Sequence, residues 1–272
     1  MAKEIKVKVP GSTANIGAGF DCLSIALSRY VWASTFGDGE PCDSNSIIRT
    51  AYEQAGGSNQ IWFGHNLEPG RGLGFSAAAR AAGAAVAFME DGASLEESKD
   101  AVFKIVTELE GHGDNAAASV YGKFNIVCQD VAYQLELPNL KKLFLWIAKE
   151  QSSTDKSRMK ISEHLSVNDA VFNISNVALL VSSLYENRFE HLRVATQDKI
   201  HQNIRLQASP ESEKVLLHAL NSGVDAVWLS GGGPSIAMIA SAEQQKIIKS
   251  GLPELGLAIE LEVDNLGIQE VL

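Results

Sequence analysis

Short apolar runs and amphipathic segments alternate along the whole chain, with glycine-rich turns between them. Residues 4–9 alternate charged and apolar side chains, and this two-residue period predicts a half-buried strand. A longer apolar run covers 22–33, and the turn residues of 37–45 follow it. Further buried strands are predicted from the short apolar runs at 143–148, 226–229, 236–240 and 257–263.

Helical periodicity and capping residues appear between these strands. Ser94 with Glu97, and Ser241 with Gln244, form the capping-box pattern that opens a helix. Helices are predicted over 46–54, 76–89, 94 to about 109, 167–184 and 209–219, with one more after Ser241. Because helices and strands intermix throughout, the predicted class is α+β with two layers in each lobe. Turn residues at 137–142 predict a boundary between a domain over 1–140 and a domain over 141–272.

Charge and length narrow the possible partners. The 272 residues suffice for one large domain or two modest ones. The net charge of 23 − 33 = −10 argues against broad binding of nucleic acid, so local donors must hold any anionic substrate. No apolar stretch is long enough to suggest a membrane span, and no signal peptide is expected. The three cysteines lack paired spacing, which favours a reducing cytoplasm over a disulfide framework or zinc site.

The sharpest local feature is the glycine-dense segment at 69–79, PGRGLGFSAAA. Alternating Gly70, Gly72 and Gly74 allow positive φ and lead into a helix, whose first N–H groups are free to bind phosphate. Ser76 lies in the first turn, where its hydroxyl could contact Mg²⁺ or phosphate. A tight turn before a closely packed alanine helix would explain the same residues. The segment is neither a Walker A loop nor a dinucleotide-binding fingerprint.

Two other segments share this glycine-rich character. Residues 10–21, PGSTANIGAGFD, place Asn15 and Asp21 in a loop where they could bracket an ammonium or hydroxyl group, although a solvated connection would look similar. Residues 230–235, SGGGPS, separate two apolar strands, and three glycines there indicate close backbone approach or a plain β-turn.

Taken together and in this order, the three segments resemble the three signature motifs of the GHMP kinases. The resemblance covers essentially the whole chain. It implies an N-terminal ATP-binding lobe similar to the second domain of ribosomal protein S5, and a ferredoxin-like C-terminal lobe. It also implies that the chain uses ATP and Mg²⁺.

Further segments resemble the homoserine kinase branch of this family: EGHGDN at 110–115, STDKSR at 153–158, DAVFN at 169–173 and DKIHQNIR at 198–205. This resemblance implies transfer of the ATP γ-phosphoryl group to L-homoserine, giving O-phospho-L-homoserine in threonine biosynthesis. It also implies a homodimer. Two alternatives stay open: a GHMP kinase for another small alcohol, and a non-catalytic relative that binds ligand.

The resemblance assigns roles by position. Ser76 and Glu110 would bind Mg²⁺ and, with Asn115, form the catalytic set; Asn115 would orient the acceptor hydroxyl without acting as a base. Nucleotide contacts would come from Pro69, Gly70, Arg71, Gly72, Leu73, Gly74, Phe75, Ser76 and Ala77. The substrate pocket would comprise Asn15, Asp21, Asn115, Thr154, Arg158, Arg205 and Gly232. A carboxylate and two guanidinium groups suit a zwitterionic amino acid.

Simpler interpretations apply to several of these residues. Glu110 and Asp114 could be solvated charges at a helix boundary, and Arg158 and Arg205 could form surface ion pairs. His112 and His201 are expected to be structural histidines.

The sequence also departs from the family pattern. Phe75 replaces the first of two serines, which favours the non-catalytic alternative. Gly113 replaces a proline, and 34–66 is a compressed region in which adenine contacts cannot be assigned.

Overall fold

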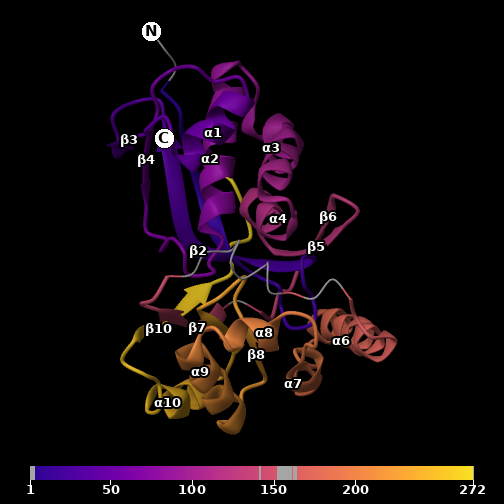
Figure 1. Ribbon diagram of the computed structural model, residues 1–272. Helices are drawn as coiled ribbons and strands as arrows, with labels where there is room; N and C mark the ends of the chain where they lie inside the picture. Colours follow the sequence, from indigo (N-terminus) through magenta and orange to yellow (C-terminus); the bar gives the residue numbers. More distant parts are fainter. Residues whose placement is uncertain (1–3, 141, 152–160, 162–163, 272) are drawn as a thin grey trace.

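The computed structural model describes residues 4–140, 142–151, 161 and 164–271. It contains two lobes, each built on one sheet (Figure 1). The first sheet has seven strands: β1 (Lys6–Ala14), β2 (Leu23–Ser34), β3 (Glu40–Pro41), β4 (Trp62–His65), β5 (Phe124–Cys128), β6 (Val131–Leu135) and β11 (Gln269–Glu270). The second has four strands in the order β10-β7-β9-β8: β7 (Lys142–Ala148), β8 (Ala226–Leu229), β9 (Ile236–Ile239) and β10 (Gly256–Glu262). This arrangement confirms the predicted α+β class.

Helices cover one side of each sheet (Figure 1). The first lobe carries α1 (Ile47–Gln54), α2 (Phe75–Glu90), α3 (Leu95–Glu110) and α4 (Asp114–Tyr121). The second carries α6 (Val167–Glu186), η1 (Phe189–His191), α7 (Leu192–Ala195), α8 (Gln202–Leu206), α9 (Pro210–Asn221) and α10 (Ala242–Lys249). The capping boxes predicted at Ser94 and Ser241 are both formed, so these helix starts follow from local sequence.

The first strand is longer than predicted. It runs to Ala14, so residues 10–14 of the segment expected to be a loop are paired with β2, with a register shift between Pro10 and Gly11. A Cβ at Gly11 would lie 2.6 Å from the side chain of Leu67, so close packing explains the glycine there. The strand therefore delivers 12–15 directly to the region between the lobes.

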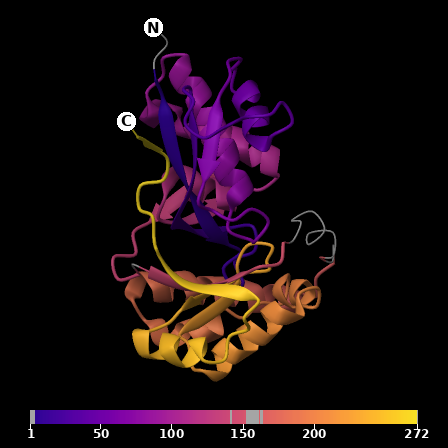
Figure 2. The same cartoon turned by 90° about the vertical axis from the view of Figure 1, so that its left-hand side faces the viewer.

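Among the described residues, the chain passes from the first lobe to the second before β7 and returns to the first after β10. Residues 263–271 leave the second sheet and return to the first, where Glu270 lies opposite Val7 in antiparallel pairing (Figure 2). A domain boundary between 140 and 141 stays a proposal; in its support, β7 begins the second sheet at Lys142.

Helix α6 is an exception to the expectation that no apolar segment is long enough to span a membrane. Among the described residues, α6 alone is long and apolar enough, by length and composition, to span a bilayer. Its buried face, however, carries Asn173 and Asn176, which contact the rest of the lobe. Those contacts are typical of a helix packed within a folded domain.

Candidate active site

The glycine-dense loop before α2 adopts the predicted left-handed backbone. Gly70, Gly72 and Gly74 have φ of 69°, 73° and 70°. Gly74 is the N-cap of α2 and provides no side-chain cap, so the first N–H groups of this 16-residue helix point outward without a local partner. The helix begins at Phe75, one residue earlier than predicted, and Ser76 lies in its first turn. This is the geometry that binds phosphate groups.

Hydrogen bonds join the three glycine-rich segments. The Ser12 N–H donates to the Leu73 carbonyl oxygen at 2.9 Å. Ser230 Oγ lies 2.7 Å from the Gly72 carbonyl oxygen and 2.8 Å from Thr13 Oγ1. A side chain at Gly72 would collide with the backbone of Ser230, so the loop can approach this closely only as glycine. Segments far apart in the sequence therefore form one site.

Between these segments lies a cavity of about 200 Å³. It is lined by Asn15, Asp21, Gly70, Gly72, Leu73, Gly74, Phe75, Ser76, Glu110, His112, Asn115, Arg205, Gly231 and Gly232. The lining contains the phosphate loop, a carboxylate and a guanidinium group, so one small space offers contacts for both anionic and cationic groups.

Ser76 and Glu110 form an oxygen-rich corner of the cavity. Ser76 Oγ donates a hydrogen bond to Glu110 Oε2 at 2.9 Å, and Glu110 also forms an ion pair with Arg80. The Glu110 side chain is only 7% exposed, which contradicts the interpretation of a solvated charge. Two adjacent oxygen donors suit a hard cation such as Mg²⁺.

Phe75 does not stack within the phosphate loop. Its ring packs edge-on against His65, with 5.1 Å between ring centroids. Gly74, Phe75 and Ser76, which form the start of α2, all line the cavity.

Asn115 is held in place from two sides. Its Oδ1 accepts a hydrogen bond from Ser12 Oγ at 2.8 Å, and its backbone N–H donates to Asp114 Oδ1 at 2.8 Å. Asp114 is fully buried, so it is not a solvated charge either. Its Oδ1 also lies 2.6 Å from His112 Nδ1.

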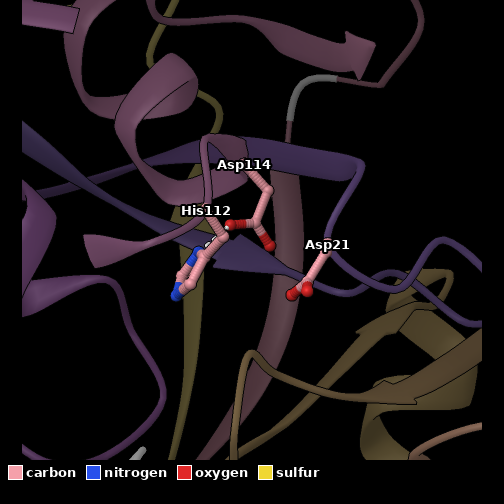
Figure 3. A group of neighbouring side chains, drawn as sticks. All are labelled: Asp21, His112 and Asp114. Atoms are coloured by element: carbon pink, nitrogen blue, oxygen red, sulfur yellow. Dashed lines mark hydrogen bonds and ion pairs between the residues drawn. The ribbon is translucent and has the colours of Figure 1, made fainter. Parts of the chain in front are cut away.

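Asp114, His112 and Asp21 form a small cluster beside Asn115 (Figure 3). One ligand-type atom from each lies within 4.8 Å of the others. Asp114 Oδ2 has no hydrogen-bond partner among the described residues and lies on the side of Asp21. Two carboxylates this close favour a cationic group at this end of the cavity.

The loop after β1 positions Asn15 and Asp21 at the end of the cavity that carries carboxylate groups. Asn15 and Asp21 both adopt left-handed backbone conformations, with φ of 56° and 57°. Asn15 Oδ1 accepts a hydrogen bond from the Asp21 N–H at 2.8 Å. This bond closes the loop and places both side chains at the same cavity, as the six-residue spacing suggested.

The opposite charge comes from Arg205 on α8. Arg205 is 5% exposed, and its Nη1 donates to the Gly231 carbonyl oxygen at 3.1 Å, so it is not a surface ion pair. The guanidinium carbon lies 5.3 Å from the centroid of the Phe20 ring. A buried, directed guanidinium group is well suited to bind a carboxylate.

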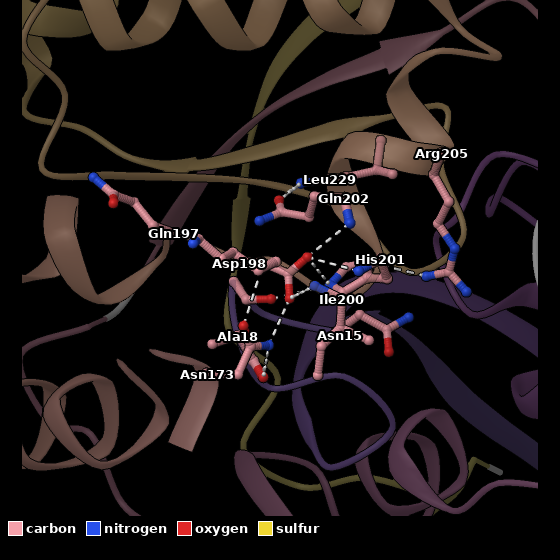
Figure 4. Close-up of polar contacts among 12 residues, drawn as sticks. Asn15, Ala18, Asn173, Gln197, Asp198, Ile200, His201, Gln202, Arg205 and Leu229 are labelled. Carbon is pink, nitrogen blue, oxygen red and sulfur yellow. Dashed lines mark hydrogen bonds and ion pairs between the residues drawn. The ribbon is translucent and has the colours of Figure 1, made fainter. Parts of the chain in front are cut away.

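His201 supports Arg205 as a structural residue. Its Nε2 lies 3.0 Å from the Gly17 carbonyl oxygen. Its Nδ1 lies 3.2 Å from Arg205 Nη1 (Figure 4). Burial lowers the pKa of His201 to about 4, so the ring is neutral near pH 7. A neutral ring with the proton on Nε2 donates to Gly17 and accepts from Arg205, which matches both contacts.

Asp198 anchors the start of α8 (Figure 4). Its Oδ2 accepts hydrogen bonds from the backbone N–H groups of His201 and Gln202, both at 2.8 Å. Its Oδ1 accepts from Asn173 Nδ2 at 2.7 Å. The Asp198 side chain thereby links α6 to the helix that carries Arg205.

The predicted site residues do not all reach the cavity. Arg71 points elsewhere: its guanidinium group donates to the carbonyl oxygens of Pro69, Ala148 and Lys149, and neither Arg71 nor Pro69 lines the cavity. Ala77 is buried in α2 and does not line it either. The predicted substrate residues Thr154 and Arg158 lie outside the described residues.

Sequence reasoning missed the residues that join the motifs. Ser12, Thr13 and Ser230 make the hydrogen bonds between segments, and His112 and Gly231 line the cavity. The signal for Gly231 was present, because it adjoins Gly232 in the same glycine run. Nothing local distinguishes Thr13 from an ordinary strand residue.

Comparison with known proteins agrees with this geometry. Residues 45–123 match the family described as GHMP kinases N terminal domain. A homoserine kinase from Caldanaerobacter subterraneus subsp. tengcongensis is 34% identical over 281 residues, covering 94% of this chain and 88% of the relative. A homoserine kinase from Petrotoga mobilis is 33% identical, covering 89% of this chain and 87% of the relative.

Solved structures share the fold. The crystal structure of homoserine kinase from Cytophaga hutchinsonii has a TM-score of 0.83 at 22% identity, covering 100% of this chain and 98% of that one. Mevalonate kinase from Methanococcus jannaschii has a TM-score of 0.69 at 12% identity, covering 96% and 98%. The sequence relatives, the matched family and the shared fold together place this chain in the GHMP kinase family, among its homoserine kinases.

Proposed function

We propose that this chain transfers the γ-phosphoryl group of ATP to the side-chain hydroxyl of L-homoserine, giving O-phospho-L-homoserine for threonine biosynthesis. The observation that carries the proposal is that Asp21, Arg205 and the N-terminus of α2 line one cavity. Asp21 would bind the ammonium group of the amino acid, and Arg205 its carboxylate. Thr154 and Arg158 are proposed to complete this pocket, by resemblance to the family.

The nucleotide would bind with its phosphates at the start of α2. There the N–H groups after Gly74 and the positive end of the helix dipole would contact phosphate oxygens. Ser76 Oγ and Glu110 would hold Mg²⁺, since both offer oxygen and lie 2.9 Å apart. When bound, Mg²⁺ supplies positive charge that offsets the negative charge of the phosphoryl group.

Asn115 would position the acceptor hydroxyl. Its side chain is fixed by Ser12 and its backbone by Asp114, so the amide can be directed at the hydroxyl without reorganisation. An amide does not take up a proton at neutral pH, and we assign no protein base to the reaction. Positioning and charge neutralisation account for most of the catalysis in phosphoryl transfer. The hydroxyl proton would leave through the phosphate.

The proposal is tested by ADP release from the purified chain with Mg·ATP and L-homoserine, L-threonine, L-serine, mevalonate or no acceptor. We expect release to depend on L-homoserine. Asp21→Asn should raise the Michaelis constant for homoserine at least about tenfold while that for ATP stays within about twofold, because the lost charge is the one proposed to bind the ammonium group.

The other outcomes separate the alternatives. ADP release with only a different alcohol would leave the assignment of the phosphate site in place and refute L-homoserine as the acceptor. Nucleotide binding without release for any acceptor would favour a non-catalytic relative, and Phe75→Ser would then test whether the missing serine is the reason.

The proposal includes a homodimeric enzyme in the cytoplasm that binds neither membrane nor nucleic acid. In its support, the chain carries a net charge of −10 and its cysteines Cys22, Cys42 and Cys128 are all free.

A further inference from the structure

Arg80 places a positive charge against Glu110, one of the two proposed metal ligands. It follows Ser76 by four residues, so both side chains lie on the same face of α2. From this face the Arg80 guanidinium group forms an ion pair with Glu110, the last residue of the neighbouring helix α3 (Figure 1). Apart from Glu90 at the other end, Arg80 is the only charged residue of this alanine-rich helix.

The two carboxylate oxygens of Glu110 have different partners. Oε2 accepts the hydrogen bond from Ser76 Oγ at 2.9 Å. Oε1 faces Arg80 Nη1 in the ion pair, and it accepts no hydrogen bond from the described residues. Ser76 and Glu110 line the cavity, whereas Arg80 does not. Arg80 therefore balances the charge of the carboxylate without taking up space in the cavity.

This arrangement is poorly suited to hold a divalent ion on its own. A carboxylate that already has a cationic neighbour attracts a second cation less strongly, because the two positive charges repel each other. Mg²⁺ is usually held by one or two carboxylates together with the phosphate groups of the substrate. One hydroxyl and one paired carboxylate thus make a metal site that is incomplete without a nucleotide.

We propose that Arg80 is a positioning residue that tunes the metal site, an inference that rests on the proposed function. Arg80 holds the Glu110 carboxylate in place and weakens its affinity for a free divalent ion. The chain then binds the ion mainly as part of the nucleotide complex, whose phosphate groups supply the negative charge that Arg80 offsets. Without nucleotide, the corner formed by Ser76 and Glu110 retains little metal.

An ion pair that only joins α2 to α3 predicts the opposite effect on metal binding. If Arg80 does no more than orient Glu110, its removal lowers the affinity for a divalent ion by about 10- to 100-fold, as is typical for the partners of metal ligands. If Arg80 competes with the ion, its removal raises the affinity instead. Damage to the fold also lowers the affinity, so only competition gives a gain.

Binding of Mn²⁺ to the full chain, without nucleotide or acceptor, tests the inference through the electron paramagnetic resonance signal of the free ion. The unmodified chain should bind Mn²⁺ no more tightly than roughly millimolar. Arg80→Gln keeps a hydrogen-bond donor beside Glu110 but removes the charge, and it should bind Mn²⁺ about tenfold more tightly. Arg80→Lys restores the charge and should stay within about twofold of the unmodified chain. Equal or weaker binding by Arg80→Gln would overturn the inference.

A second comparison assigns the gain to Glu110. The cluster of Asp21, His112 and Asp114 also offers ligand atoms for Mn²⁺. The Arg80→Gln substitution is therefore repeated in a Glu110→Gln background, where it should no longer change the affinity for Mn²⁺. A gain that persists in this background would come from another site and would refute the role of Arg80 at Glu110.

Arg49→Gln is the matched control. The Arg49 side chain is 16% exposed and pairs with Glu53 on α1 of the same lobe, and Arg80 is 19% exposed, so each substitution removes a partly buried, paired charge. Arg49→Gln should leave the affinity for Mn²⁺ unchanged, and a gain equal to that of Arg80→Gln would contradict a local effect.

One comparison does not depend on the folding of Arg80→Gln. Without nucleotide, Glu110→Gln alone should change the affinity for Mn²⁺ by less than about twofold, because Arg80 already offsets the carboxylate. Roughly micromolar binding by the unmodified chain that Glu110→Gln abolishes would overturn the inference. None of these measurements needs turnover. Kinase activity with no gain in Arg80→Gln would leave the proposed function and refute this inference, and a gain without ADP release would do the reverse.

Discussion

Replacing Gly74 by alanine should damage both the stability and the nucleotide site. Gly74 has a φ of 70°, a conformation that costs an alanine about 1–2 kcal/mol. A Cβ there would also overlap Ser12 Oγ and lie 3.1 Å from Asn115 Oδ1, so the Ser12–Asn115 hydrogen bond must break. That bond contributes about 0.5–1.5 kcal/mol. We expect the free energy of unfolding to fall by about 1.5–3.5 kcal/mol in total.

Gly223 provides the matched control for this substitution. Its φ is 79°, close to that of Gly74, but a Cβ there meets nothing within 4 Å. The Gly223→Ala substitution should therefore lower the free energy of unfolding only by the conformational cost, about 1–2 kcal/mol, and leave the Michaelis constant for ATP unchanged. Urea unfolding measures the free energy of unfolding, and ADP release measures the Michaelis constant for ATP. The reasoning fails if Gly74→Ala is no less stable than Gly223→Ala and binds ATP as well as the unmodified chain.

Three further predictions concern charged groups. Burial lowers the folded-state pKa of His201 from 6.5 to about 4, so the unfolded chain binds more protons than the folded chain between these pH values. The free energy of unfolding should therefore fall by up to about 3 kcal/mol as the pH drops from 6.5 to 4. Thermal unfolding of a His201→Gln variant across this pH range should lack the part of the decrease that comes from His201. Glu110→Gln should raise the Mg²⁺ concentration for half-maximal activity about tenfold or more, and an unchanged Mg²⁺ titration would remove Glu110 from the metal site. Arg205→Lys should weaken homoserine binding about tenfold to a hundredfold in calorimetric titration, because lysine cannot keep the contact with Gly231 and present a planar donor pair; equal affinity would contradict this role.

Local chemistry made parts of the fold predictable. The capping residues Ser94 and Ser241 act within one turn, so their helices begin where the sequence indicates. Helix α4 and the β5–β6 hairpin were not predicted, since the small residues around 116–118 have no clear helical stripe. The extension of β1 to Ala14 depends on pairing with β2, and its composition alone resembles a loop.

The candidate site was predictable where a motif is contiguous, and less so where it depends on tertiary contacts. The glycines of 70–74 indicate a phosphate loop by themselves, and the structure gives them the expected backbone. Burial of Asp114 and Arg205 could not be read from the sequence, because both look like ordinary surface charges until the lobes enclose them. The orientation of Arg71 likewise depends on the distant carbonyl groups of Ala148 and Lys149.

The return of the chain end to the first sheet has a consequence for synthesis on the ribosome. Strand β1 is translated before the second lobe, whereas β11, which covers the outer edge of β1, is translated after it. Until Gln269 and Glu270 are translated, the edge of β1 stays open as a template for pairing with other chains. The N-terminal lobe can therefore be completed only after the second lobe has been translated, and a nascent chain stalled shortly before residue 263 should depend on chaperones more than the finished protein does.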